Sequence, residues 1–364
     1  MSRIQRIKKG ADIRLEGRPA DTVSKAPSAQ VYAVKPLDFL GVITKLTVRQ
    51  GDSVKAGSTL FYDKKKPSVK YASPVAGTIK DIVRGAKRRI LAIEIEADSE
   101  NSYVDFGVLD VSASNRDQIL SRLLESGMFP FFRQRPFDVA ANPEDHPRSI
   151  HISAFDSSPL AASASVALDG RLADFQQGID ALAKLAGDGG VHLGLRRSDN
   201  ALAGVKNCQM TYFEGPHPSG NVGVQIHHTA PLSKGEVVWT ISPQDVANLG
   251  GLLTSGKYIP SRVVACGGSE CKDPQHVLTL SGASIASIID VPSKAHNGHE
   301  VRVISGSPLT GDQVSKDGFL GAHHFAIALL PEGHDPKFLL TSGWLSLGLG
   351  RFSLSKSFLT WLMP

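Results

Sequence analysis

The strongest constraint in this chain is an amphipathic stripe flanked by two short apolar runs. Between residues 168 and 185, apolar side chains recur every three or four positions, the spacing of one face of an α-helix. The stripe consists of Leu168, Leu172, Phe175, Ile179, Leu182 and Leu185. Ser149–Phe155 precedes it, and Val191–Leu195 follows it after glycines that end the helix. A strand, a helix and a strand in this order predict parallel strands joined by a right-handed crossover.

The alternation of strand and helix continues to residue 256. Apolar runs predict strands at Gln209–Phe213, Val222–His228 and Glu236–Ile241. Ser242 and Pro243 then begin a helix, because a serine hydroxyl caps free N–H groups and proline suits the first helical position. The other markers of this helix are Asp245 in a capping box, Val246, Leu249, Leu252 and Leu253 on its buried face, and Gly256 at its end.

A shorter helix is predicted at residues 114–126, before the alternation begins. Ser114 and Asp117 form its capping box, and Gly127 ends it. Its apolar face consists of Ile119, Leu120, Leu123 and Leu124.

Two other regions are rich in strands. In residues 42–96, Thr44–Arg49 and Leu91–Glu96 alternate apolar and polar side chains, which indicates a small sandwich or barrel. In residues 257–330 we predict a compact α+β module with strands at Arg262–Cys266, His276–Leu280, Val301–Ser305 and His324–Leu330. Ser353–Leu362 has the pattern of an amphipathic helix whose apolar face lacks a partner, so we expect the sequence to stop before a further helical segment.

Length and composition set limits on the function. The 364 residues are enough for several domains of roughly 100–200 residues each. No run approaches the ~18–20 apolar residues that cross a bilayer, and the basic N-terminus lacks the apolar core of a secretory signal. We therefore expect a cytoplasmic chain whose membrane function comes through partners.

Two basic clusters stand out, Lys64–Lys66 and the set Arg84, Lys87, Arg88 and Arg89. Solvated surface explains them most simply; anionic lipid, an acidic partner and nucleic acid are alternatives.

The cysteines and histidines give no metal or catalytic site. Three cysteines are too few for an iron–sulfur cluster, and Cys266, Cys271 and His276 match no zinc spacing, so we expect reduced, structural thiols. His227 and His228 are adjacent on a predicted strand, so their side chains should point to opposite faces; the same holds for His323 and His324 if a strand begins there. His217 lies in a stiff turn between prolines. No Ser-His-Asp or Cys-His set is apparent, and we assign no catalytic residue.

Residues 51–79 resemble biotinyl- and lipoyl-carrier domains. The motifs are G-D-S-V-K-A-G-S-T-L at Gly51–Leu60, then Asp63-Lys64, then S-P-V-A-G-T-I at Ser73–Ile79. Carrier domains place a modified lysine at a hairpin tip, which here would be Lys64. The return to Pro74 is longer than in that family and three lysines follow in a row, so we expect a structural barrel. A carrier acylated at Lys64 is the alternative.

Motifs along nearly the whole chain point to one family. They are I-K-K-G-A-D-I at Ile7–Ile13, E-G-R-P at Glu16–Pro19, F-Y-D-K-K-K-P-S-V-K at Phe61–Lys70, S-P-V-A-G-T-I, R-G-A-K-R at Arg84–Arg88, F-R-Q-R-P-F at Phe132–Phe137, I-S-A-F-D-S-S-P-L at Ile152–Leu160, E-G-P-H-P-S-G-N at Glu214–Asn221 and R-V-I-S-G at Arg302–Gly306. Together they resemble the A subunit of the sodium-translocating NADH:quinone oxidoreductase.

The resemblance implies an α+β multidomain fold and kinship with the flavin subunit of respiratory complex I. The implied parts are an N-terminal segment with a biotinyl/lipoyl-like β-barrel (residues 1–100), a Rossmann-like α/β domain (101–256), a ubiquitin-like β-grasp module (257–331) and the truncated start of a C-terminal helical domain (332–364). In that complex electrons pass from NADH through flavins and an iron–sulfur centre to a quinone while sodium is exported. The resemblance places those carriers on other subunits.

The residues themselves argue against a bound nucleotide. A flavin or nicotinamide cofactor needs a glycine-rich turn at a helix start, where backbone N–H groups are free to bind phosphate. The clearest glycine cluster, Gly187–Gly190, follows a predicted helix, and G-x-G-x-x-G is absent. Where the related flavin subunit carries its glycine-rich loop, this chain places Met128–Phe137, whose phenylalanines would exclude a pyrophosphate. We expect no FMN or NAD on this chain.

The same segment provides the candidate quinone contacts. An apolar ring with two carbonyl acceptors suits aromatic walls and a few donors, and arginine donors stay charged. The candidates are Phe129, Phe131, Phe132, Arg133, Arg135 and Phe137. Alternatively, these residues pack the helix that ends near Gly127 against the next domain, or bind a partner subunit.

These expectations define one function and a rival. We expect a peripheral, cofactor-free subunit on the cytoplasmic face of the bacterial inner membrane, which supports assembly with other subunits, including membrane subunits, and contributes to the quinone site. We expect no activity from the isolated chain and no nucleic acid as partner. The rival is an electron-transfer subunit of a related ferredoxin:NAD oxidoreductase, whose flavin, nicotinamide and cysteine-rich motifs are absent here.

Overall fold

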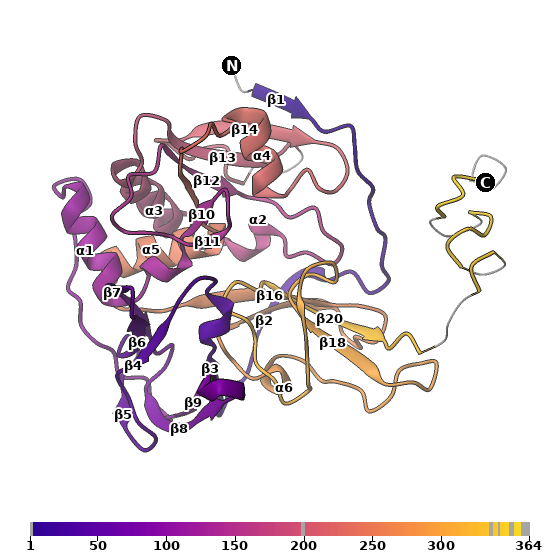
Figure 1. The fold of residues 1–364 in the computed structure, drawn as a ribbon, viewed down its shortest axis with the longest axis horizontal. Coiled ribbons are helices and arrows are strands. Elements are labelled where there is room, and N and C mark those ends of the chain that lie inside the picture. The colour runs from indigo at the N-terminus through magenta and orange to yellow at the C-terminus, as the bar shows by residue number, and fades with distance from the viewer. Residues whose placement is uncertain (1–2, 198–200, 335–337, 341–342, 349–352, 358–364) are drawn as a thin grey trace.

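The computed structural model describes residues 3–197, 201–334, 338–340, 343–348 and 353–357. Its sheets form three parts that pack against one another (Figure 1). We call them the N-terminal β domain, the α/β domain and the C-terminal sheet. In Figure 1 the α/β domain lies above the other two parts.

The α/β domain is built on a seven-stranded sheet in the order β1-β14-β13-β12-β15-β10-β11. The strands are β1 Arg3–Arg6, β10 Arg133–Arg135, β11 Val139–Ala140, β12 Ser149–Ser153, β13 Gly190–Arg196, β14 Gln209–Glu214 and β15 Val238–Thr240. Three pairs are parallel: β12 with β13, β13 with β14, and β12 with β15. Helix α3 (Leu172–Leu185) joins β12 to β13, which confirms the predicted strand–helix–strand unit. The helix begins four residues later than the stripe, because Gly170 has a left-handed φ of 70° and separates α3 from the short helix α2 (Ala164–Ala167).

Both predicted capped helices are present, with a correction to each cap. α5 (Pro243–Ser255) has the predicted Ser242 cap and ends at left-handed Gly256, but the predicted capping box is incomplete, because the Asp245 carboxylate accepts the Ser242 hydroxyl. The capping box predicted at Ser114 for α1 (Arg116–Ser126) is wrong by one residue. Asn115 accepts the backbone N–H of Gln118, and the Gln118 side chain accepts the N–H of Asn115.

The strand predicted at Val222–His228 is wrong, because residues Val222–Thr229 form helix α4. β-branched valines favour strands only weakly, and tertiary contacts override that preference. In α4, Gln225 donates to the Ser153 hydroxyl (2.8 Å) and to the backbone oxygen of Ser219 (3.2 Å). These bonds fasten α4 to the carboxyl end of β12, so His227 and His228 follow one another on a helix, with ring centroids 5.1 Å apart.

The N-terminal β domain consists of a four-stranded sheet (β3-β9-β8-β5) and a three-stranded sheet (β4-β6-β7). The strands are β3 Val31–Val34, β4 Thr44–Leu46, β5 Ser53–Val54, β6 Thr59–Asp63, β7 Lys66–Ala72, β8 Gly77–Arg84 and β9 Ile90–Ala97, with 3-10 turns η1 Pro36–Asp38 and η2 Ala86–Arg88. The predicted alternation holds at Ile93, Glu94, Ile95 and Glu96, whereas Leu91 faces solvent. Two small sheets with their apolar faces together match the predicted sandwich or barrel.

The C-terminal sheet has six strands in the order β19-β18-β20-β16-β17-β2. The strands are β2 Ala20–Lys25, β16 Ser261–Gly267, β17 Gln275–Leu280, β18 Val301–Ser305, β19 Asp312–Val314 and β20 Ala326–Pro331, and the short helix α6 spans Ile285–Ile288. All four strands predicted for this region are present.

The first 25 residues complete two sheets that lie in different parts of the molecule. β1 pairs in parallel with β14 of the α/β domain, and β2 pairs in parallel with β17 of the C-terminal sheet. Neither pairing is predicted by the sequence, in which these residues are grouped with the barrel.

The helix predicted near the end of the chain falls partly outside the described residues. Of the amphipathic helix expected at Ser353–Leu362, residues 353–357 form turns, and residues 358–362 lie outside the described residues. Among the residues that the structure describes, no helix is long and apolar enough to cross a membrane.

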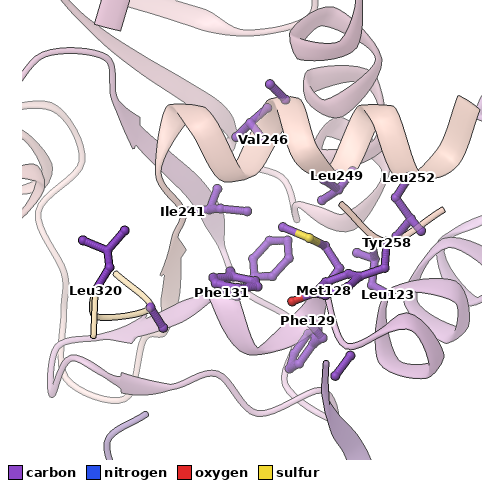
Figure 2. Close-up of a cluster of buried hydrophobic side chains, with 14 of the residues drawn as sticks. Leu123, Met128, Phe129, Phe131, Ile241, Val246, Leu249, Leu252, Tyr258 and Leu320 are labelled. Carbon is purple, nitrogen blue, oxygen red and sulfur yellow. The ribbon is translucent and has the colours of Figure 1, made fainter. Parts of the chain in front are cut away.

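One core cluster of buried side chains runs through all three parts. It joins Phe39 and Tyr71 of the N-terminal β domain, Leu123 and Phe131 of the α/β domain, and Leu320 beside the C-terminal sheet. Figure 2 shows part of this cluster, with the face of α5 above the phenylalanines that follow α1. The three parts are therefore not separate cores joined by linkers.

Gly127 provides a test of this shared core. A Cβ there would lie 2.6 Å from the Cβ of Ala72 on β7, and its φ is 77°. Gly235 has a φ of 86° and nothing within 4 Å, so G235A isolates the backbone cost. We expect G235A to lower the free energy of unfolding by about 1 kcal/mol and G127A by about 2–4 kcal/mol in urea titrations. Equal effects would mean that α1 and β7 do not pack as described.

Candidate interdomain site

The phenylalanines predicted as quinone contacts lie in the core. After Gly127 ends α1, a 3-10 turn η3 (Phe129–Phe131) leads into β10. Phe129, Phe131 and Phe132 are 1%, 4% and 0% exposed. Phe129 and Phe132 meet the edge of the buried Trp239 ring at centroid distances of 5.4 and 5.6 Å. Their rings therefore pack the end of α1 onto the sheet of the same α/β domain.

Phe131 lies where the three parts meet. Its ring is 6.2 Å from Phe39 of the N-terminal β domain and 5.9 Å from His323, which precedes β20. The guanidinium of Arg262 on β16 lies 5.0 Å from the same ring. Burial lowers the pKa of His323 to about 3, and Arg133 and Arg262 add to the shift. The imidazole is therefore neutral at physiological pH, and its ring serves as an aromatic wall.

The polar candidates lie on the surface hairpin formed by β10 and β11. Arg133 and Arg135 pair with the two oxygens of Asp138 at 2.6 and 3.1 Å. Phe137, at the hairpin tip, is 83% exposed. The six predicted residues thus divide into three buried rings, two half-buried arginines and one exposed ring. Whether either group binds quinone stays a prediction.

A cavity of about 130 Å³ separates this hairpin from the N-terminal β domain. It is lined by Leu40, Gly41, Asp63, Lys66, Val69, Tyr71, Val139, Ala140 and Ala141. Tyr71 is 2% exposed, and its hydroxyl has no hydrogen-bond partner among the described residues. Burial, with a smaller contribution from the Asp63 carboxylate, raises the pKa of Tyr71 far above its ordinary value. The hydroxyl therefore stays protonated and can donate to a ligand or a water.

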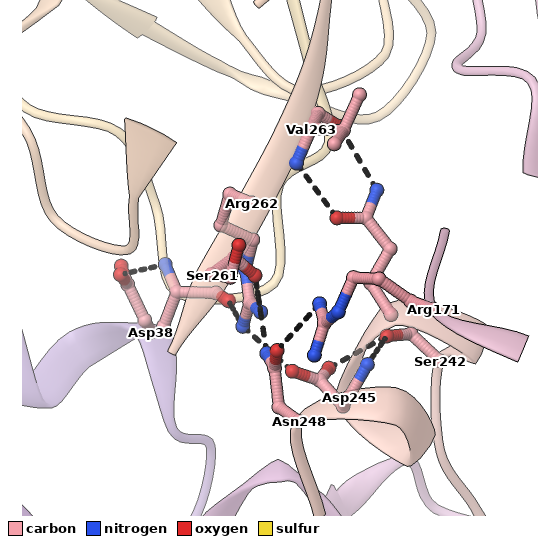
Figure 3. Close-up of polar contacts among 10 residues, drawn as sticks. Asp38, Arg171, Ser242, Asp245, Asn248, Ser261, Arg262 and Val263 are labelled. Carbon is pink, nitrogen blue, oxygen red and sulfur yellow. Dashed lines mark hydrogen bonds and ion pairs between the residues drawn. The ribbon is translucent and has the colours of Figure 1, made fainter. Parts of the chain in front are cut away.

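Arg262 and Asp245 form the polar centre of the junction (Figure 3). Their side chains are 0% and 1% exposed, and a guanidinium nitrogen lies 2.8 Å from an Asp245 oxygen. Arg262 also donates to the backbone oxygens of Ser261 and Ala322, and its guanidinium lies between the rings of Phe131 and Phe325. Burial raises the pKa of Asp245, whereas the positive charge of Arg262 opposes that shift. Asp245 thus depends mainly on Arg262 for charge compensation, with a smaller contribution from Arg171.

This ion pair lies at the topological switch point of the α/β sheet. β12 is followed by β13 on one side, whereas β15 pairs on its other side, and open α/β sheets bind ligands at the carboxyl ends of such strands. α5 begins directly after β15. The Gln244 side chain accepts the N–H of Val263 (2.8 Å) and donates to its oxygen (2.9 Å). β16 of the C-terminal sheet therefore covers the start of α5.

The loop after β12 also runs onto the C-terminal sheet. Leu160 packs with Ile304 and Ala328. The N–H of Ser163 donates to Nε2 of His276 (3.2 Å), whose Nδ1 is 2.7 Å from the backbone oxygen of Ala20. The loop after β12 and the segment after β15 therefore both contact the C-terminal sheet, and both ring nitrogens of His276 are in hydrogen bonds.

The glycine cluster lies after α3, as predicted. The N–H groups of Gly187 and Gly189 donate to the backbone oxygens of Pro147 and Arg148, each at 2.9 Å, and Gly190 donates to Gly187. These donors close the turn into β13 and do not point into open space.

Two of the remaining candidates, Cys266 and Cys271, lie near each other at and just after the end of β16. Cys266 and Cys271 are buried and free, and burial raises the pKa of both thiols. Lys64 lies at the tight β6–β7 turn and is exposed, so the hairpin expected from the carrier resemblance is present. His217 accepts or donates through Nδ1 to the Ser157 hydroxyl at 3.0 Å. Among the residues that the structure describes, no three His, Cys, Asp or Glu side chains group as metal ligands.

The residues that organise the junction carry only weak signals in the sequence. Arg262 is the one charged residue in the otherwise apolar strand run Arg262–Cys266, and that contrast is a signal for a buried ion pair. Asp245 was assigned only to a helix cap, and it also accepts the Ser242 hydroxyl at 2.6 Å. Nothing in the sequence indicates that Tyr71 is buried beside a cavity.

Comparison with known proteins identifies three family models along the chain. They are described as the NqrA N-terminal barrel-sandwich hybrid domain (residues 5–98), the NqrA second alpha/beta domain (114–258) and the NQRA C-terminal domain, of SLBB type (263–316). These matches give a multidomain α/β protein with a barrel-sandwich hybrid, an α/β domain and a C-terminal SLBB domain.

Two curated relatives match almost the whole chain, and both are described as the A subunit of a Na(+)-translocating NADH-quinone reductase. The relative from Serratia proteamaculans (strain 568) is 37% identical over 359 residues, which cover 97% of this chain and 78% of the relative. The relative from Rhodopirellula baltica is 35% identical over 368 residues, with 99% and 79% covered.

The buried ion pair generates a prediction about stability. R262M leaves the Asp245 carboxylate buried without its partner, so we expect a loss of about 3–5 kcal/mol in the free energy of unfolding. R262M combined with D245N should recover part of this loss. The control is R302M, whose partner pair with Glu332 is at the surface and should contribute less than about 1 kcal/mol. If R262M and R302M unfold at the same urea concentration, the ion pair does not hold the junction together.

Proposed function

Because this chain belongs to the NqrA family, the A subunits of the Na+-translocating NADH-quinone reductases, we propose that it is the cofactor-free, peripheral subunit of that pump. Membership makes the other subunits of the reductase its partners. In the proposed role the chain supports assembly on the cytoplasmic face of the bacterial inner membrane and contributes to the quinone side. Flavins and the iron–sulfur centre are carried by other subunits.

The observation that carries the cofactor-free proposal is the covered switch point. A nucleotide bound there would place its phosphates at the start of α5, where free N–H groups and the helix dipole attract anions. In this chain Ser242 accepts the N–H of Asp245, and Gln244 and Asp245 bind Val263 and Arg262 of β16. The Asp245 carboxylate would also repel phosphate. The rings of Phe129 and Phe132 are packed on Trp239 and leave no turn of small residues.

We propose finer fold assignments on the same basis. The N-terminal β domain is a biotinyl/lipoyl-like barrel used as structure, since its hairpin tip carries three consecutive lysines. The α/β domain is Rossmann-like in its parallel strands, and the C-terminal sheet with α6 is a β-grasp module. Through their exposed edges, these parts provide surfaces for partner subunits.

For the quinone, we propose the cavity beside the β10–β11 hairpin rather than the buried phenylalanines. Its walls are mainly apolar, and Tyr71 offers a buried donor that lacks a partner among the described residues. Val139 and Ala140 of β11 and the exposed Leu40 form part of its wall, whereas Arg133, Arg135 and Phe137 belong to the same hairpin but do not line the cavity. At about 130 Å³ the cavity is smaller than the roughly 300–1,000 Å³ of typical ligand pockets. A partner subunit therefore supplies the remaining wall in this proposal.

The first experiment separates this function from its rival. The purified chain should be colourless and release no flavin on denaturation, whereas an electron-transfer subunit would be yellow or brown. After mild detergent extraction, the tagged chain should carry the membrane subunits with it. The same tag on a chain expressed without those subunits is the control. A coloured preparation with a stoichiometric prosthetic group, or a native chain found only free of partners, would refute the proposal.

Tyr71 allows a second test in the assembled complex. Y71F removes an unpaired buried hydroxyl, so the free energy of unfolding should be unchanged or higher. If the hydroxyl donates to a quinone carbonyl, the KM for quinone should rise about three- to ten-fold with little change in kcat. The control is Y32F, because the Tyr32 hydroxyl is buried but accepts the N–H of Ala29 away from this cavity. A KM for quinone that Y71F leaves unchanged would exclude this role.

A further inference from the structure

The tip of the β8–β9 hairpin carries four cations. Arg84 ends β8, and Lys87, Arg88 and Arg89 follow in the turn before β9 begins at Ile90. All four residues are exposed. Lys87 and Arg88 have left-handed φ values of 54° and 59°, a conformation that costs roughly 1–2 kcal/mol for side chains of this kind.

None of these four side chains has an acidic partner among the described residues. The first acidic residues along the two strands are Asp81 and Glu94, which pair across β8 and β9 away from the tip. The hairpin tip at Lys64–Lys66 differs in this respect. There the Asp63 carboxylate accepts the backbone N–H of Lys65, so a negative charge lies within the turn. The β8–β9 tip is therefore the more strongly positive of the two.

Apolar groups accompany the charges. Leu91 is 36% exposed, and its side chain lies over Gly85, with a methyl group 3.1 Å from the place of a Cβ. Ala86 is exposed between Gly85 and Lys87. Small apolar groups next to cations on one hairpin tip suit the boundary between lipid headgroups and acyl chains.

We propose that the β8–β9 hairpin tip, Arg84 to Leu91, binds the anionic headgroups of the membrane surface and orients the chain on it. A protein partner would need a larger surface, since a standard interface uses roughly 20–30 residues on each side. Headgroups need only clustered, unpaired charge, at short range and without shape complementarity. The inference rests on the proposed peripheral position beside a membrane, and it assigns that position to one hairpin.

The test is sedimentation of the purified chain with vesicles. One set contains phosphatidylcholine alone, and the other contains phosphatidylcholine with roughly 30% phosphatidylglycerol as the anionic probe, a share that gives a membrane a negative surface. We expect binding to the anionic vesicles only, and weaker binding at high salt. The variant K87N/R88N/R89Q should bind roughly a hundred-fold more weakly, at about five-fold for each lost cation. Asparagine is used at the two left-handed positions because it tolerates that conformation.

A matched control comes from the other tip. K64Q/K65Q/K66Q removes the same charge from three consecutive residues and should weaken vesicle binding much less. Thermal unfolding of both variants checks that each remains folded. The proposal is overturned if the unmodified chain does not sediment with anionic vesicles or if the two triple variants lose binding equally.

A further outcome distinguishes lipid from protein. If K87N/R88N/R89Q keeps vesicle binding but loses the membrane subunits during purification, the tip binds an acidic protein surface and the lipid assignment is wrong. Failure of vesicle binding alone leaves co-purification and the colourless spectrum intact, so it does not touch the proposed function.

Discussion

The buried pair of Arg262 and Asp245 is the interaction on which the junction depends. Removing a guanidinium and a carboxylate from water costs several kcal/mol for each ion, and only a close partner and further hydrogen bonds compensate for it. Arg262 comes from the C-terminal sheet and Asp245 from α5, and the ring of Phe131 stacks on the guanidinium. Because neither charge can be left alone, the α/β domain and the C-terminal sheet are held in one arrangement. That requirement gives polar specificity to a core that is otherwise apolar.

The same contact explains how a nucleotide-type sheet can serve without a nucleotide. Parallel strands with a reversal of order create a crevice at their carboxyl ends, and open α/β sheets bind their ligands in that crevice. Here the occupant is β16, joined through Val263 to Gln244 and through Arg262 to Asp245. The sheet keeps its geometry while the ligand position becomes an internal interface. Rings at the end of α1 fill the neighbouring space against Trp239.

Sequence patterns predicted the helices, caps and strands that depend on residues close together in the chain. The α3 stripe from Phe175 to Leu185, the Ser242 cap of α5 and the alternation at Ile93–Glu96 depend on spacing within a few residues, and the structure confirms them. The outer positions of these patterns fail, since Leu172 and Leu91 are 46% and 36% exposed. α4 was mistaken for a strand because Gln225 is held by Ser153, a contact across 72 residues that no periodicity reveals. The site divides in the same way. The sequence drew attention to Phe131, but its neighbours Phe39, Arg262 and His323 come from distant segments.

The pairing of the first two strands has a consequence for synthesis on the ribosome. β1 finds its neighbour in β14, and β2 finds its neighbour in β17, each about 200 residues or more further along the chain. The amino-terminal segment therefore emerges long before the backbone groups it must pair with exist. At roughly 5–20 residues per second, these edges wait unpaired for at least about ten seconds. Nascent chains of this protein consequently expose strand-forming backbone to chaperones until translation passes β17.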